Sequence, residues 1–279
     1  MKKIYLCAIS NISSGNCSED CSFCTQSSYN NADIKKYKEK DIATIVQEAK
    51  EARKNQAVGF CLVTAGKGLN DKKLEFVCKA AKEVLKEIDD LNLIACNGTA
   101  TKEQLKELKK AGIKSYNHNL ETSKEYYNKI CSTHDWNERY ITCQNIKSTG
   151  LKLCTGGIFG LGESEKDRES FLNSLISLSP DSIPLNFFHP NPALPLENKI
   201  FDIEKALYWI RKVSTSLPDT RIMVAGGREI TFQERWPEIF EAGANSIVIG
   251  NYLTTIGNQA EKDIKIIKNL GYEIAKNCE

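Results

Sequence analysis

The sequence predicts an α/β protein that folds as a single (β/α)8 barrel of the TIM type. Short apolar stretches rich in β-branched residues recur along the chain, and helical patterns follow them. Strands that alternate with helices imply parallel pairing through right-handed crossovers. Eight such units in 279 residues fit one closed barrel, whose usual size is about 250 residues. An open, doubly wound parallel sheet is the alternative.

The candidate strands share a short length and an aliphatic, β-branched composition. They are expected at residues 4–10, 58–64, 91–97, 113–119, 151–155, 182–189, 221–225 and 246–250. No long linker, repeat array or low-complexity tract interrupts this series, so one domain is expected over residues 1–279.

The helices between these strands carry local start and stop signals. The clearest helix is expected at residues 71–88, where apolar residues recur on one stripe. Thr101 followed by Gln104, and Thr231 followed by Glu234, predict capping boxes at two helix starts. Three glycines are expected to end helices in the left-handed conformation just before a strand: Gly112, Gly150 and Gly243.

Composition excludes several classes of protein. The formal charge of +2 argues against a general nucleic-acid binder, and no apolar run approaches the length of a membrane span. An odd count of 11 cysteines in a chain of this length does not suit a secreted disulfide scaffold. We therefore expect a cytoplasmic protein with reduced thiols and neither nucleic-acid nor membrane partners.

The strongest local signal is a C-x3-C-x2-C spacing formed by Cys17, Cys21 and Cys24 in a polar loop after the first strand. A structural zinc site normally takes four protein ligands from paired motifs. Three thiolates instead suit a four-iron cluster with one iron left open. A zinc loop remains the alternative for the motif, and a protein that binds zinc or an iron–sulfur cluster without catalysis is the alternative for the function.

With an aromatic residue, Phe23, before its third cysteine, this motif resembles that of the radical S-adenosylmethionine (SAM) superfamily. The later run from Gly156 to Glu163 is similar to the superfamily's G-x-I-x-G-x-x-E motif. The resemblance implies the same barrel and a 4Fe-4S cluster whose open iron chelates SAM and cleaves it to methionine and a 5′-deoxyadenosyl radical. It also implies that SAM is contacted by Phe23, Gly156, Ile158 and Gly160.

Three further cysteines lie on different predicted strands. Cys61, Cys96 and Cys154 belong to the second, third and fifth strands. Catalytic side chains of such barrels come from the ends of several strands, so these thiols can converge in one cavity. Each alone is equally consistent with a buried core residue.

With their neighbours, these cysteines resemble the biotin synthase family. The matching runs are residues 24–28, 60–61, 95–99, 152–157, 225–229, 242–247 and the specific Tyr116-Asn117-His118-Asn119-Leu120-Glu121-Thr122. The resemblance covers residues 13–271, almost the whole chain. It implies conversion of dethiobiotin to biotin, with the radical chemistry carried by cofactors rather than by catalytic side chains.

The same resemblance assigns further roles. Cys61, Cys96 and Cys154 would hold a second iron–sulfur cluster, expected to be 2Fe-2S, that donates the sulfur. Asn119 and Glu121 would contact the ribose of SAM, and Asn117, Asn119 and Asn186 would surround the ureido ring of dethiobiotin. A flavodoxin- or ferredoxin-like electron donor and a homodimer are also implied. The rival enzyme is another radical SAM barrel, similar to the hydrogenase-maturation enzymes.

One departure from the family concerns the fourth ligand of the second cluster. Family members commonly place an arginine shortly before the A-G-R-E motif, whereas Met223 stands at that position here. Arg221 lies two residues earlier, on the same face of the predicted strand, and is the candidate substitute.

The remaining cysteines and histidines are assigned as follows. Cys78 and Cys143 are expected in the core, while the roles of Cys7 and Cys131 stay open. His118 is expected beside the site. His134 is expected on the surface, and His189 at the end of its strand.

Overall fold

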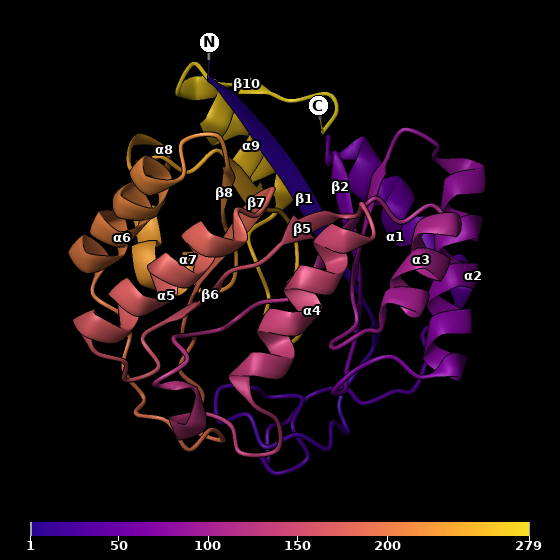
Figure 1. Ribbon diagram of the computed structural model, residues 1–279. Coiled ribbons are helices and arrows are strands. Elements are labelled where there is room, and N and C mark those ends of the chain that lie inside the picture. The colour runs from indigo at the N-terminus through magenta and orange to yellow at the C-terminus, as the bar shows by residue number, and fades with distance from the viewer. Residues whose placement is uncertain (1, 279) are drawn as a thin grey trace.

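The computed structural model describes residues 2–278 as a closed parallel barrel surrounded by helices (Figure 1). The barrel strands are β1 (Lys3–Ser13), β2 (Gly59–Thr64), β3 (Asn92–Cys96), β4 (Ser115–Asn117), β5 (Lys152–Cys154), β7 (Ser182–Phe187), β8 (Arg221–Val224) and β9 (Ser246–Val248). They pair in that order, and β9 pairs back with β1. This eight-stranded closure confirms the predicted fold class and excludes the open sheet.

Two short strands were not predicted. β6 (Gly157–Phe159) pairs with β7 just after β5, so the fifth strand of the barrel is interrupted at Thr155 and Gly156. The sequence predicts that the strand ends at residue 155, yet the glycine-rich backbone beyond it packs closely. A Cβ on Gly156 would collide with the Pro184 carbonyl oxygen. β10 (Glu273–Ile274) adds to the outer end of β1.

The helices form the outer layer of the barrel. They are α1 (Ile42–Lys54), α2 (Asp71–Glu87), α3 (Lys102–Lys110), α4 (Trp136–Ser148), α5 (Glu165–Leu178), α6 (Ile203–Ser216), α7 (Arg228–Phe232), α8 (Glu238–Glu241) and α9 (Ala260–Asn269). Single 3₁₀ turns lie at Tyr127–Lys129 and Gln233–Arg235. Helices and sheet enclose one large apolar core, and Cys143 is fully buried in it, as predicted.

The local helix signals were confirmed in most cases. Thr101 and Gln104 form the expected capping box. Gly112, Gly150 and Gly243 all have positive φ angles. The prediction at Thr231 was wrong, because α7 already begins at Arg228 after the left-handed Gly227 and places Thr231 inside the helix.

The interior of the barrel is lined differently from its outside. Its buried residues form a separate cluster of small and medium side chains: Cys7, Cys61, Val63, Ile94, Met223, Ala225 and Val248. TIM barrels usually fill this space with bulky branched residues. The smaller side chains here leave room for a cavity.

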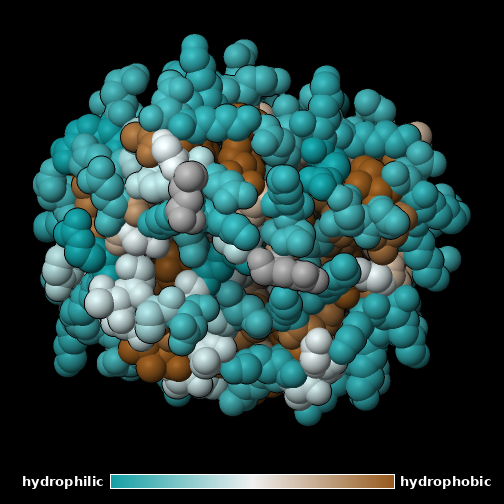
Figure 2. All heavy atoms as spheres, turned by 90° about the horizontal axis from the view of Figure 1, so that it is seen from above, coloured by the Kyte–Doolittle hydropathy of each residue, from teal (hydrophilic) through white to brown (hydrophobic). Residues whose placement is uncertain are grey.

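The two ends of the barrel differ in what covers them. β10 pairs with β1 at Lys3 and Ile4, so both chain ends lie at the same end of the barrel, away from the loops that follow β1 (Figure 1). That face is mainly hydrophilic, with scattered apolar patches (Figure 2). Across residues 2–278, no helix combines the length and the hydropathy needed to cross a membrane.

Candidate functional site

The main candidate site is a cavity of about 380 Å³ inside the barrel, at the carboxyl ends of the strands. This volume lies within the range of small-molecule sites. Ten of the predicted site residues line it: Phe23, Cys24, Cys61, Cys96, Asn117, Asn119, Glu121, Cys154, Ile158 and Asn186. Segments far apart in the sequence therefore meet here, as the barrel topology predicts.

The cysteine triplet lies in the loop after β1, at the rim of this cavity. The Asn30 side-chain amide donates to the carbonyl oxygens of Cys21 and Cys24, at 3.1 Å and 2.9 Å. The Cys17 amide donates to the Gln26 carbonyl oxygen at 3.0 Å, which closes the loop. All three thiols are partly exposed, and Cys24 also lines the cavity. Three thiols on a loop that hydrogen bonds hold in place fit an iron–sulfur cluster with one open iron.

The loop is anchored by residues whose role the sequence did not reveal. His134 was predicted on the surface but is buried, with Nδ1 2.7 Å from the Glu19 carboxylate and Nε2 2.8 Å from the Tyr127 hydroxyl. Cys131, left open above, is also buried, with its Sγ 3.7 Å from that of Cys21. The Asp20 carboxylate accepts from the backbone N–H of Ser132 at 2.9 Å. The segment before α4 therefore holds the cysteine loop in place.

A second group of thiols lies deeper, on the strands themselves. A hydrogen bond between the Cys61 and Cys96 thiols, together with burial, raises the pKa of Cys61. Burial also raises the pKa of Cys154, to about 12. The Cys61 and Cys154 thiols are therefore protonated in the metal-free protein and would release protons on binding metal. Soft thiolates in an apolar interior fit an iron–sulfur cluster.

Polar acceptors without partners lie between the two thiol groups. Glu121 has a φ of +68°, and burial raises the pKa of its carboxyl group, although Arg139 lies 2.9 Å from Oε1. Within the described chain, Glu121 Oε2 and Asn117 Oδ1 are buried without a hydrogen-bond partner. Both residues line the cavity. Such acceptors fit a ligand that brings hydroxyl or amide donors, as SAM and a ureido ring do.

Two other predicted asparagines already have partners in the backbone. Asn119 Oδ1 accepts from the Gly156 N–H at 3.2 Å. Asn186 accepts from the Gly226 N–H at 2.9 Å and donates to the Gly157 carbonyl oxygen at 3.2 Å. They fix the glycine-rich segment against the cavity. Gly160 in turn donates its N–H to Glu163 at 3.0 Å.

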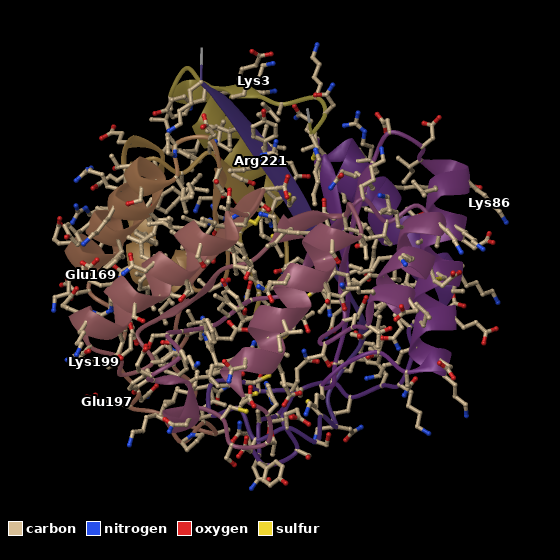
Figure 3. All side chains as sticks on the ribbon, in the orientation of Figure 1. Lys3, Lys86, Glu169, Glu197, Lys199 and Arg221 are labelled. Atoms are coloured by element: carbon tan, nitrogen blue, oxygen red, sulfur yellow. The ribbon has the colours of Figure 1, made fainter. Side chains whose placement is uncertain are left out.

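Arg221 lies apart from the cavity lining. Its guanidinium carbon is 3.6 Å from the centre of the Tyr5 ring, and Nη2 donates to the Cys278 carbonyl oxygen at 3.2 Å. Figure 3 labels Arg221 toward the end of the barrel that carries the termini. Met223, two residues later, is buried and lines the cavity.

Comparisons with known proteins point in one direction. The family model "Radical SAM superfamily" matches residues 11–175, and "Biotin and Thiamin Synthesis associated domain" matches residues 184–273. The chain is 62% identical to a biotin synthase of Nautilia profundicola, over 100% of both chains. It is 60% identical to a biotin synthase of Nitratiruptor sp., over 99% of both chains.

Solved structures at low identity share the fold. A methylornithine synthase superposes with a TM-score of 0.82 at 17% identity, over 98% of this chain and 84% of that one. The FeFe-hydrogenase maturase HydG from Carboxydothermus hydrogenoformans superposes with a TM-score of 0.80 at 17% identity, over 98% and 68%. At this identity the likeness shows the barrel alone.

Proposed function

The chain belongs to the biotin synthase family of the radical SAM superfamily, and from this we propose how its residues divide the work of making biotin. It is an enzyme that converts dethiobiotin to biotin by SAM-dependent sulfur insertion. Its cofactors are a 4Fe-4S cluster with SAM and a second iron–sulfur cluster. When bound, the first cluster supplies the electron that cleaves SAM to a 5′-deoxyadenosyl radical, and the second supplies the sulfur.

The rim of the cavity is assigned to the first cluster and SAM. Cys17, Cys21 and Cys24 would hold the cluster, because they are three free cysteines on one anchored loop. For SAM we propose Phe23, Asn119, Glu121, Gly156, Ile158 and Gly160. Glu121 Oε2 supports this assignment. It has no hydrogen-bond partner among the described residues, and a ribose hydroxyl could donate to it.

The inner part of the cavity is assigned to the substrate and the sulfur donor. Asn117, Asn119 and Asn186 would contact the ureido ring of dethiobiotin, whose N–H groups match the Asn117 carbonyl oxygen. Cys61, Cys96 and Cys154 would hold the second cluster; the sequence predicts Arg221 as its fourth ligand, but Arg221 does not line the cavity. The protein would contribute positioning: the cavity would hold the substrate next to both SAM and the sulfur donor and limit its contact with water.

Three assignments about the whole protein rest on the family resemblance and the composition. We propose a flavodoxin- or ferredoxin-like electron donor, a homodimer and a cytoplasmic location. We also propose one domain over residues 1–279. The pairing of β5 with β7 and of β9 with β1 supports it, because strands from both family-matched regions complete one sheet.

The main support for this function is the 62% identity to a biotin synthase over the full length of both chains. A cavity lined by three strand thiols agrees with it. The test is anaerobic reconstitution with iron and sulfide, followed by turnover with dethiobiotin, SAM and a reductant. Biotin and 5′-deoxyadenosine are both expected. SAM cleavage without biotin, despite two intact clusters, would contradict the substrate assignment.

A variant separates sulfur insertion from other radical SAM chemistry. Cys154→Ala should abolish biotin formation but leave 5′-deoxyadenosine formation measurable, because the first cluster is untouched. Cys78→Ala is the matched control, since Cys78 lies on α2 outside the barrel. Biotin formation by Cys154→Ala at the wild-type rate would show that another sulfur source is used.

A further inference from the structure

We infer that Cys7, rather than Arg221, is the fourth protein ligand of the second cluster, so that four thiolates from β1, β2, β3 and β5 hold it. The inference rests on the proposed function, because it assumes that Cys61, Cys96 and Cys154 are ligands. It adds a ligand that the family pattern does not supply at this position.

Cys7 lies in the same chamber as the three strand cysteines. It is only 6% exposed, and it lines the cavity together with Cys61, Cys96 and Cys154. It also belongs to the small apolar cluster that fills the inside of the barrel, separate from the large outer core. A cysteine that only packed against helices would belong to the outer core, as Cys143 does.

The position of its sulfur is defined by the neighbouring strand. Cys7 on β1 pairs with Gly59 on β2. A Cβ built on Gly59 would lie 2.8 Å from Cys7 Sγ and 3.3 Å from Ile94 Cδ1. Since Ile94 is on β3 and lines the cavity, Cys7 Sγ points inward, over a residue that has no side chain of its own. Gly59 thus leaves the space that the Cys7 sulfur occupies.

The electrostatic influence of these thiols on one another is consistent with their place in one cavity. Cys7 contributes to the raised pKa of Cys61 and Cys154 to that of Cys7, while the Arg221 charge lowers the pKa of both Cys7 and Cys154 from outside the cavity lining. Burial is the main cause of the raised pKa of Cys7, which is about 12. The argument for Cys7 therefore rests on geometry: its thiol and those of Cys61, Cys96 and Cys154 line one cavity.

The two competing ligands are less suitable. The Arg221 guanidinium already stacks on Tyr5 and donates to the Cys278 carbonyl oxygen, and it does not reach the cavity lining. Met223 does line the cavity, but a neutral thioether is a weaker ligand for iron than a thiolate. Cys7 is the remaining soft ligand on the inner strands that can be deprotonated.

The experiment isolates the second cluster in the full-length chain. The parent protein carries Cys17→Ala, Cys21→Ala and Cys24→Ala, so that bound iron reports only the inner site. In this background, Cys7→Ser is compared with Cys61→Ser as the positive control. Cys78→Ser and Arg221→Lys are the controls expected to keep the cluster. After anaerobic reconstitution, iron, sulfide and the iron X-ray absorption spectrum are measured.

We expect Cys7→Ser to lose about half or more of the iron and sulfide, as Cys61→Ser does, or to acquire an oxygen neighbour at iron. Arg221→Lys and Cys78→Ser should match the parent. Unchanged iron, sulfide and spectrum in Cys7→Ser would overturn the inference and leave the proposed function standing. If the parent itself binds no iron, the second cluster, and with it the proposed function, is contradicted.

If Cys7→Ser does not fold, the X-ray absorption spectrum of the parent protein, which retains Cys7, still tests the inference. The iron in the parent should then have sulfur as its only type of neighbour, because all four protein ligands are thiolates. A nitrogen or oxygen neighbour in the parent would overturn the inference in favour of Arg221.

Discussion

At the scale of single residues, Glu121 combines a strained backbone with a buried carboxylate oxygen that has no hydrogen-bond partner among the described residues. Its backbone has a positive φ, which is uncommon outside glycine, and its carboxyl group is buried beside Arg139. Strain of this kind is typical of functional sites, where surrounding contacts impose it. Both features reduce the stability of the folded protein, and a ligand that donates a hydrogen bond to Glu121 would offset part of this cost.

This cost gives a pH-dependent prediction for Glu121→Gln. Burial raises the carboxyl pKa above its ordinary value of 4.5 in the folded, metal-free protein. A raised pKa stabilises the fold below the unfolded pKa, and that stabilisation is lost as the pH rises through the folded value. Glutamine stays neutral, so its free energy of unfolding should improve relative to wild type as pH rises from about 4 to 8. Urea unfolding of both metal-free proteins measures this.

The same variant should bind SAM more weakly. Loss of one acceptor for a ribose hydroxyl corresponds to about a tenfold weaker affinity, measured by calorimetry on the reconstituted protein. The reconstituted Asp41→Asn variant is the control for SAM binding, because Asp41 caps α1 outside the cavity lining. A pH-independent difference in stability, or unchanged SAM affinity, would contradict the assigned role of Glu121.

The roles of site residues that are close together in the sequence could be predicted, whereas the roles of residues brought together only by tertiary packing could not. The C-x3-C-x2-C spacing puts three thiols on one loop without knowledge of the fold. His134 could not be identified in this way, because its burial depends on contact with Glu19, a residue on a distant loop. The deep position of Cys7 likewise depends on which strands flank it.

At the scale of elements, the interrupted fifth strand shapes the site. β5 ends at Cys154, and β6 resumes at Gly157. The break turns the glycine-rich backbone toward Asn119, which receives the Gly156 N–H. Local signals predicted the strands and most helix caps, but not β6, since its pairing depends on the approach of β7.

Gly156→Ala tests how closely this segment must pack. The new Cβ would collide with the Pro184 carbonyl oxygen, a backbone atom that cannot rotate away. We expect a loss of about 1–3 kcal/mol in the free energy of unfolding and a loss of SAM binding. Urea unfolding and calorimetry measure the two effects.

Gly271→Ala is the matched control for this substitution. Its Cβ would meet no atom of the described chain within 4 Å, although its φ is +77°. It should cost about 1 kcal/mol from backbone strain and leave SAM binding intact. Equal effects of the two substitutions on SAM binding would show that crowding at Gly156 is not the cause.

At the scale of the whole molecule, a buried ion pair joins the last two βα units. Arg228 at the start of α7 lies 2.5 Å from Asp263 on α9, and both side chains are fully buried. The Arg228 guanidinium also lies over the Trp236 ring, at 4.6 Å. This pair links the A-G-R-E-like segment after β8 to the helix that follows β9.

Asp263→Asn should therefore destabilise the entire barrel. It removes the fully buried partner of the Arg228 guanidinium and leaves only Glu229, 2.9 Å away and partly exposed, and breaking a buried pair typically costs about 3–5 kcal/mol. Urea unfolding should show one earlier, cooperative transition. Glu238→Gln, which weakens the exposed pair with Arg235, should change stability little. An equally small effect of Asp263→Asn would show that Glu229 alone is a sufficient partner for Arg228.

The architecture as a whole was predictable from the count of alternating units, because short parallel strands with helical connections have few arrangements. Closure itself was not visible in any local segment. It depends on β1 pairing with β9, between residues such as Tyr5 and Ser246 at opposite ends of the chain.

The depth of the two thiol groups along the barrel implies an order of assembly. Cys7, Cys61 and Cys154 lie within strands, whereas Phe23, Cys24 and Glu121 lie on loops beyond the carboxyl ends. At the opposite end, β10 pairs with β1, and Arg221 packs between Tyr5 and the Cys278 carbonyl oxygen. Iron and sulfide for the inner thiols are therefore expected to enter from the loop side, before the outer compartment fills. After the second cluster has donated its sulfur, iron and sulfide could therefore reach the inner thiols again only once SAM has left the outer part of the cavity.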